Sequence, residues 1–345
     1  MFCKDKMAYN LELSAKEVPF RALIKLYMKR AKEIESYLSK RPDEWGKFQS
    51  EFNAEVNGVF RNIMNFEKAN LASGHEDKVY KLKRLFIDRI RKIFVRGVYT
   101  DWSLRKPFGY AGDFKIIDDI YCNNPTTKGF DRLFDNYFQM SAISVAVRNR
   151  KEDLKRFITD FVSQRNNAKL KIMDLACGPC RDIKENLTEN RILLKNVVFD
   201  CYDNDAQAIE FAKDLLKNFY SINFFKENAL RIAFRRNINN IIGKKYDIIF
   251  STGLFDYLTE RVASRLIESL KKLLNPKGIL FIANVRDKYS NPSVHFMELV
   301  GDWNLIYRDD DTFIKIFLEA GFKTNQIKIN YEQQGIMQYI YAFNK

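Results

Sequence analysis

Apolar residues recur at helical spacing through the first third of the chain. Residues 21–38 and 78–98 carry this pattern most clearly, and in the second segment a single apolar stripe faces away from the basic residues. The stripe consists of Val79, Leu82, Phe86, Ile90, Ile93 and Val98. This periodicity predicts amphipathic helices and a helical N-terminal domain over residues 1–105.

The pattern changes near residue 165, where strand-sized apolar runs begin to alternate with helical segments. The apolar runs occupy residues 169–176, 196–203, 221–227, 246–252 and 277–285. Strands that alternate with helices predict an α/β domain with a parallel sheet covered on both faces, here over residues 166–345. Two final runs, 322–335 and 336–344, flank a Gln-Gly turn and predict a terminal hairpin added to that sheet.

Residues 106–165 connect these two parts. Their first portion, within 105–121, is punctuated by proline and glycine and is typical of a loop that enters a helix. We therefore expect a helical cap or linker between the N-terminal helices and the sheet domain.

Composition narrows the partners only slightly. The 345 residues include 58 Lys and Arg against 44 Asp and Glu, a formal net charge of +14. Such a charge favours acidic partners such as nucleic acid, anionic lipid or an acidic carrier protein. The basic residues are scattered through every segment, however, and this distribution equally fits charges spread over solvated faces.

Several classes of protein are disfavoured. No apolar window approaches the length of a membrane span, and residues 1–18 carry charges throughout with no apolar core of a signal peptide, so we expect a cytoplasmic protein. Five cysteines without regular spacing do not predict a disulfide framework. Two histidines leave little for a metal site, and we expect none.

The segment KIMDLACGPCRDI, residues 171–183, permits two interpretations. Cys177 to Cys180 is spelled like a thioredoxin redox site, whereas Asp174 to Gly178 is typical of a nucleotide-binding turn between a buried strand and a helix. Asp203 ends the next strand, where a carboxylate can bind ribose hydroxyls. A thioredoxin would not explain Asp203 or Asn228, so nucleotide binding is favoured. The G-x-G-x-x-G motif of dinucleotide-binding proteins fits poorly.

The turn resembles that of the class I S-adenosylmethionine-dependent methyltransferases, whose motif is of the type D/E-x-G-x-G-x-G. This chain has DLACGPC, an acidic residue at the end of the next strand and Glu-Asn-Ala after the third strand. The resemblance implies a Rossmann-like sheet, mostly parallel with a C-terminal antiparallel hairpin, and S-adenosylmethionine as the cofactor. Ala176 and Cys180 stand where the family usually has glycine; alanine is tolerable there if φ is negative.

The resemblance also implies roles for individual residues. Asp174 would orient the turn and the amino group of the methionine moiety. Asp203 would hold the ribose diol, and Arg148 is a candidate for the cofactor's carboxylate. The other positions would line the methionine moiety (Ala176, Gly178), lie beside the adenine (Asn204), cap its edge (Asn228, Ala229) or pass along the methionine part towards the substrate (Ser251, Gly253).

A narrower resemblance rests on the strings GYAGDF, AVRNR, GLFDYL and MELVGDWNLIYR. They are similar to a bacterial methyltransferase group that includes 3-hydroxypalmitic acid methyl ester biosynthesis proteins, which implies methyl esterification of a fatty acid or a similar small carboxylate, free or carrier-bound. A carboxylate is already ionised at neutral pH and needs a clamp rather than a base. Candidate residues at the acceptor are Tyr110, Asp113, Asp256, Tyr257, Tyr307 and Arg308.

Two other functions remain open. The net charge fits an RNA methyltransferase, although STGLF after the fourth strand lacks the Asn/Asp-Pro-Pro-aromatic motif of enzymes that methylate exocyclic base amines. The non-glycine residues at 176 and 180 also fit a degenerate cofactor-binding fold that serves as a partner-binding protein.

Overall fold

The computed structural model describes residues 18–165, 168–235, 238 and 242–345. Residues 1–17, on which the expectation about a signal peptide rests almost entirely, lie outside the described residues. Within the described part of the chain, no helix is both long and apolar enough to cross a membrane.

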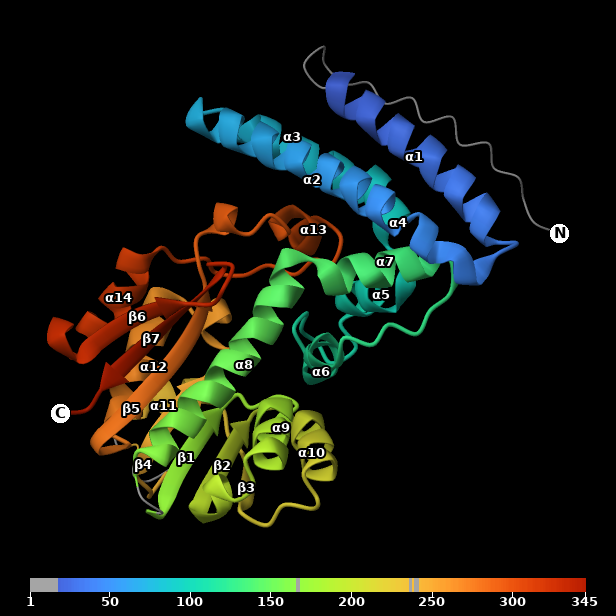
Figure 1. The fold of residues 1–345 in the computed structure, drawn as a ribbon. Coiled ribbons are helices and arrows are strands. Elements are labelled where there is room, and N and C mark those ends of the chain that lie inside the picture. Colours follow the sequence, from blue (N-terminus) through green and yellow to red (C-terminus); the bar gives the residue numbers. More distant parts are fainter. Residues whose placement is uncertain (1–17, 166–167, 236–237, 239–241) are drawn as a thin grey trace.

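A seven-stranded sheet forms the centre of the molecule in the part of the chain that the structure describes (Figure 1). Its strand order is β3-β2-β1-β4-β5-β7-β6. The strands are β1 (Leu170–Leu175), β2 (Val197–Asp203), β3 (Ile222–Lys226), β4 (Tyr246–Ser251), β5 (Leu274–Val285), β6 (Ile327–Tyr331) and β7 (Met337–Phe343). β1 to β5 pair in parallel, and the β6–β7 hairpin joins β5 through an antiparallel pairing of β7. The predicted Rossmann-like class I methyltransferase sheet is therefore confirmed.

Helices cover both faces of this sheet. One face carries α8 (Ala142–Ser163), α9 (Arg181–Glu189) and α10 (Ala206–Leu215), whose apolar residues join those of β1, β2 and β4 in one core cluster. The other face carries α11 (Ala229–Phe234), α12 (Glu260–Lys271) and α14 (Asp310–Glu319) over a second cluster. Because both faces are buried, the central strands read as continuous apolar runs.

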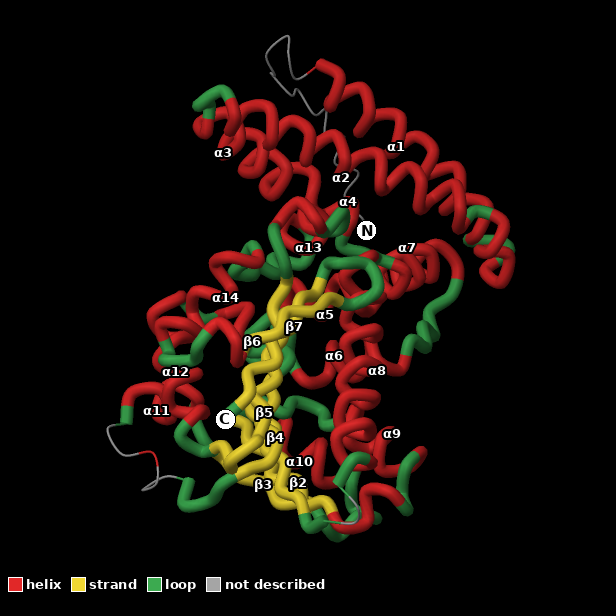
Figure 2. The backbone as a smooth tube through the Cα atoms, turned by 60° about the vertical axis from the view of Figure 1, so that its left-hand side comes forward, coloured by secondary structure: helices red, strands yellow, loops and turns green. Residues whose placement is uncertain are grey.

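The N-terminal helices form a layer beyond one end of the sheet (Figures 1 and 2). They are α1 (Val18–Leu38), α2 (Gln49–Ala72), α3 (Glu76–Leu85), α4 (Arg91–Phe94), α5 (Gly97–Arg105), α6 (Phe114–Cys122) and α7 (Gly129–Met140). α13 (Val294–Leu299), which follows the sheet's fifth strand, packs on α2. The apolar residues of this layer belong to the same core cluster as the α8 face of the sheet.

The helix predicted over residues 78–98 is interrupted. A π-helical segment, Phe86–Ile90, separates α3 from α4, and the chain then turns into α5 at Gly97. The wider π turn shifts the apolar stripe, so Phe94 is buried in place of Ile93. Val98 lies beyond the end of this helix, in α5, and is exposed. The predicted helix is therefore present from Glu76 to Phe94 with a π turn inside it, but it ends before Val98 because the chain leaves the helix at Val95 and Arg96. Regular 3.6-residue periodicity cannot reveal the π turn.

Candidate active site

The turn after β1 holds its backbone in the left-handed region at three positions. The φ angles are +58° at Ala176, +54° at Gly178 and +52° at Cys180. We expected alanine to be tolerable at position 176 if φ were negative, but φ is positive there. For a residue with a side chain this conformation costs about 1–2 kcal/mol, which explains why glycine is usual at such positions. Cys180 ends the turn as the N-cap residue of α9.

A cavity of about 530 Å³ opens over the carboxyl ends of the parallel strands. This volume is within the range of ligand sites for small molecules, about 300–1,000 Å³. The polar side chains that line it include a group that follows β2 and β3, namely Asp203, Asn204, Asp205, Glu227 and Asn228. Its apolar side chains come mainly from the helical layer and include Ile117, Ile120, Phe138, Phe296 and Met297. The cavity thus has a polar end at the sheet and an apolar end beneath the helices.

Asp203 connects the turn to the polar end. Its Oδ2 accepts a hydrogen bond of 2.9 Å from the backbone N–H of Gly178, and its Oδ1 accepts one of 2.9 Å from Asp205. Burial raises the pKa of Asp203 above its ordinary value. Asn228 lies nearby as the N-cap of α11, where its side chain accepts a hydrogen bond from Leu230. Asn204, Asn228 and Ala229 all line the cavity, as the sequence predicts for an adenine site.

Asp174 and Ser251 lie behind the cavity wall. The Asp174 side chain is buried, its Oδ2 has no hydrogen-bond partner, and burial raises its pKa. An unpartnered buried carboxylate oxygen fits a bound cation. Asp174 is not among the residues that line the cavity, so the structure does not bring it to the methionine moiety, where the resemblance placed it. Ser251 donates its hydroxyl to the carbonyl of Leu175 at 2.7 Å and so joins β4 to β1. Two residues that follow β4, Thr252 and Gly253, do line the cavity.

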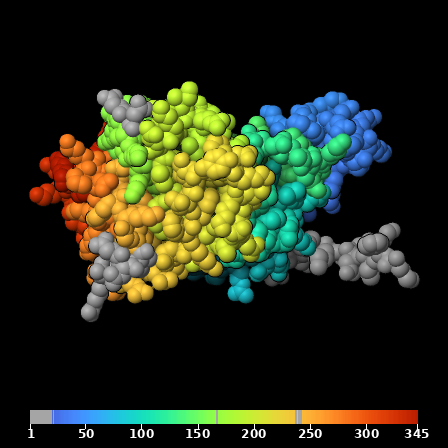
Figure 3. Space-filling model, turned by 90° about the horizontal axis from the view of Figure 1, so that it is seen from below, coloured from blue at the N-terminus to red at the C-terminus, as the bar shows by residue number. Residues whose placement is uncertain are grey.

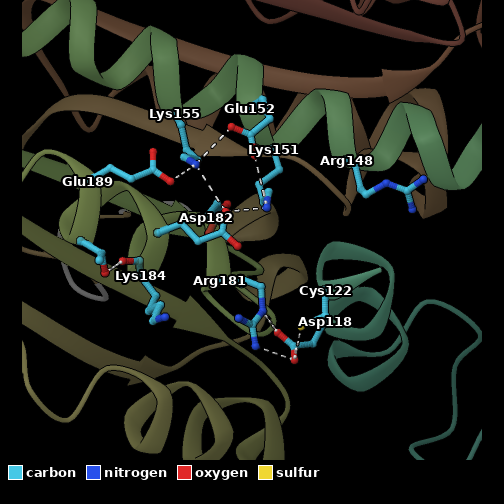
Figure 4. Close-up of polar contacts among 12 residues, drawn as sticks. Asp118, Cys122, Arg148, Lys151, Glu152, Lys155, Arg181, Asp182, Lys184 and Glu189 are labelled. Atoms are coloured by element: carbon cyan, nitrogen blue, oxygen red, sulfur yellow. Dashed lines mark hydrogen bonds and ion pairs between the residues drawn. The ribbon is translucent and has the colours of Figure 1, made fainter. Parts of the chain in front are cut away.

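The structure brings Arg150 to the cavity in place of Arg148. Arg148 donates hydrogen bonds to Gln139 and to the carbonyl of Ile120, and it lies apart from the ion pairs between α8 and α9 (Figure 4). Arg150 is almost fully buried and lines the cavity, where it donates to the carbonyl of Thr252 and to the Tyr121 hydroxyl. Its Nε has no partner.

Asp182 also lines the cavity, although the sequence pattern did not single it out. It lies in the first turn of α9, and burial raises its pKa to about 6. The same turn is fixed from outside, because Arg181 forms an ion pair of 2.5 Å with Asp118 on α6 (Figure 4). Lys151 and Lys155 of α8 bind acidic residues of α9, so α6, α8 and α9 hold the turn jointly.

The strings that carry the narrower resemblance meet at one part of the cavity. Tyr110 donates its hydroxyl to Asp205 at 3.2 Å, and Tyr257 accepts a hydrogen bond of 2.8 Å from the indole of Trp303. A Cβ atom at Gly112 would lie 2.6 Å from the Tyr257 hydroxyl, so only glycine permits this close approach. In the space-filling view, the teal segment near residue 110 adjoins the yellow segment near residue 205 (Figure 3).

Three predicted acceptor residues do not line the cavity. Asp113 is buried as the N-cap of α6, where its carboxylate accepts hydrogen bonds from Ile116 and from the Trp102 indole. Arg308 is buried and donates to the backbone carbonyls of Phe255 and Leu258. It therefore fixes the loop that carries Asp256 and Tyr257 rather than facing the cavity. Tyr307 is half-buried and its hydroxyl has no hydrogen-bond partner.

Asp256 is the predicted acidic residue that does face the cavity. Its Oδ1 accepts a hydrogen bond of 2.6 Å from the backbone N–H of Val285, and burial raises its pKa to about 6 although Arg150 and Arg308 oppose this shift. The folded protein thus binds the proton of the Asp256 carboxyl group more tightly than the unfolded chain does.

The free energy of unfolding, measured as a function of pH, should reveal the ionisation of Asp256. As the pH rises from about 4 to about 6, ionisation of Asp256 is expected to remove up to about 3 kcal/mol of unfolding free energy. Asp256→Asn keeps the acceptor for Val285 but removes the charge. Urea unfolding of both proteins should show the variant gaining stability relative to the wild type across this range, and a constant difference between them would contradict the assignment.

Comparisons with known proteins support the fold. No protein-family model matches the sequence, and no curated protein matches it either. Among solved structures, a possible exported protein from Bordetella parapertussis is 15% identical, with a TM-score of 0.55 over 67% of this chain and 79% of its own. Magnesium protoporphyrin IX methyltransferase from Synechocystis PCC 6803, solved with bound SAH, is 13% identical over 74% of this chain and 100% of its own, with a TM-score of 0.48. At 15% identity, the likeness to the Bordetella parapertussis protein shows a shared fold alone.

Proposed function

We propose that this protein is an S-adenosylmethionine-dependent methyltransferase whose acceptor carries an apolar group. The observation that carries the proposal is the single cavity with a polar end beside Asp203 and an apolar end under the helical layer. A cofactor and an acceptor bound in one cavity can meet at the short distance that in-line transfer requires.

The polar end fits the cofactor. When bound, S-adenosylmethionine supplies an electrophilic methyl group on a sulfonium. Asp203 would hold the ribose hydroxyls, since its carboxylate is fixed by the N–H groups of Gly178 and Asp205. Asn204 and Asn228 would lie beside the adenine. Arg150 would pair with the cofactor's carboxylate, the role that the sequence assigned to Arg148.

The apolar end fits an acceptor with an aliphatic or similar body. Burial of apolar surface contributes about 25 cal/mol per Å², so a hydrocarbon chain gains substantial binding energy among Ile117, Phe138 and Met297. No histidine is among the described residues that line the cavity. Methylation of a carboxylate needs no proton removal, and we therefore favour a lipid-like carboxylate, with the Tyr257 hydroxyl at the reacting end.

Binding of S-adenosylhomocysteine, measured by isothermal titration calorimetry, tests the cofactor assignment. Asp203→Ala is expected to weaken binding by about 10- to 100-fold, since a hydrogen bond to a charged group contributes about 1.5–3 kcal/mol. Asp203→Asn retains an acceptor for Gly178 and should lose less, which separates ribose binding from collapse of the turn. Absence of binding by the folded wild type at millimolar ligand would exclude the enzyme and favour a degenerate cofactor-binding fold.

The acceptor can be sought without presupposing it. The protein is incubated with methyl-labelled cofactor in three separate reactions, which contain a lipid, a small-molecule or an RNA extract. Labelled products are identified by mass spectrometry. Label in a methyl ester of an aliphatic acid is the expected result. Label confined to RNA would contradict the carboxylate assignment while leaving methyl transfer intact.

A further inference from the structure

The turn after β1 carries a cluster of thiols that the proposed methyl transfer does not use. Cys177 and Cys180 belong to the turn, and Cys201 lies in β2 directly opposite Asp174 in the β1–β2 pairing. All three cysteines are buried. One carboxylate oxygen of Asp174 and the sulfur atoms of Cys180 and Cys201 all lie within 4.8 Å of one another. Cys177 is the third buried thiol and lies in the same turn, outside this group of three.

From this cluster we propose a binding site for one thiophilic divalent cation, of which Zn²⁺ is the type, with Cys177, Cys180, Cys201 and Asp174 as ligands. Three sulfur atoms and one oxygen are a suitable donor set for a closed tetrahedral zinc site. Two sulfur atoms bound to one zinc ion lie about 3.8 Å apart, since each Zn–S bond is about 2.3 Å. The separation between the Cys180 and Cys201 sulfur atoms therefore needs to shorten by at most about 1 Å. Cys177 lies outside this group of three, and its side chain would rotate to supply the fourth ligand.

Two further observations point to a ligand here. The Oδ2 atom of Asp174 is buried without a hydrogen-bond partner, as a metal ligand would be before the cation binds. Cys180 also adopts a left-handed conformation that glycine would adopt without strain. A side chain retained at that position places its sulfur beside Cys201 and Asp174, which glycine could not do.

This site cannot be recognised from the amino-acid sequence because its ligands come from different elements. Asp174 and Cys201 meet only through the pairing of β1 with β2, and the spacing from Cys180 to Cys201 matches no metal motif. In this position a cation would join the turn to β2. The site does not depend on the proposed methyl transfer, because metal binding can be measured without a methyl acceptor.

Cadmium titration of the chelator-treated, fully reduced protein tests the proposal. The expected result is an ultraviolet sulfur-to-cadmium charge-transfer band that saturates at one equivalent, with a parallel rise in melting temperature and displacement by Zn²⁺. Cys201→Ser and Cys180→Gly should each lose the one-equivalent band. Glycine suits the φ of residue 180, so that variant should remain folded. Cys122→Ser alters an exposed thiol and should retain the band.

Two other outcomes would contradict the proposed cation site. A folded wild type that shows no band at one equivalent, or a band unaffected by Cys201→Ser and Cys180→Gly, would overturn the site. Formation of a Cys177–Cys180 disulfide in air, with no metal bound by the reduced protein, would also overturn it and would identify a redox pair instead.

Discussion

Arg150→Ala is expected to weaken binding of S-adenosylhomocysteine by about 100-fold or more and to abolish methyl transfer. Arg150 is 4% exposed, lines the cavity and donates to the Thr252 carbonyl at the end of β4. Removing one partner from a buried pair of charged groups costs about 2–5 kcal/mol, partly because the other charge is left unpaired. Here the unpaired charge would be the cofactor's carboxylate. Calorimetry on the variant measures the loss directly.

Arg148→Ala is the matched control on the same helix. Its guanidinium binds Gln139 and the Ile120 carbonyl outside the cavity, so the variant should lose some stability but keep its affinity for S-adenosylhomocysteine. Arg150→Lys keeps the charge without the planar guanidinium and should show an intermediate affinity. Equal losses in Arg148→Ala and Arg150→Ala, with both proteins folded, would mean that α8 acts only as a scaffold.

The contrast between these two arginines shows how far the sequence could lead. The AVRNR string indicated that an arginine on a helix serves the site, and this is the helix on which Arg150 reaches the cavity. Residues 148 and 150 lie about 200° apart around a helix of 3.6 residues per turn, so they face opposite directions. The sequence could not say which face of α8 turns towards the cavity, because that depends on the packing of α8 against α6, α7 and α9.

Local patterns were otherwise sufficient for the sheet. The strands follow apolar runs, and the terminal hairpin follows the Gln-Gly turn, because these signals reside in adjacent residues. Arg308 and Asp113 illustrate the opposite case. Both were candidates at the acceptor, but each binds backbone groups or a side chain that the fold brings to it. Residue type predicts what a side chain can bind, whereas long-range packing decides what it does bind.

A cluster of ion pairs joins the helical layer to α13, and it too is formed by residues far apart in the sequence. Glu67 of α2 is 2% exposed and accepts contacts from Lys83 at 2.7 Å, Lys288 at 2.8 Å and His295 at 3.1 Å. Tyr289 adds a hydrogen bond of 3.0 Å. Although burial opposes it, hydrogen bonds from His295, Lys288 and Lys83 hold the pKa of Glu67 well below its usual range. The cluster anchors α13, whose Phe296 and Met297 line the cavity.

Glu67→Gln is expected to lower the free energy of unfolding by about 3 kcal/mol near pH 7, because it leaves the half-buried Lys83 and Lys288 without their carboxylate. The folded pKa of Glu67 is depressed, so its contribution is present above the unfolded pKa and is lost as the pH falls. Urea unfolding should therefore show the difference between variant and wild type shrinking below about pH 4.

Glu51→Gln provides the control, since Glu51 also lies on α2 and also binds an arginine, Arg30, but its side chain is 41% exposed. An exposed ion pair is screened by solvent, so this change should move the unfolding midpoint only slightly. If Glu67→Gln were no more destabilising than Glu51→Gln, the cluster would not hold α13 in place. The apolar end of the cavity would then depend on the packing of Phe296 against Phe60 and Tyr137 instead.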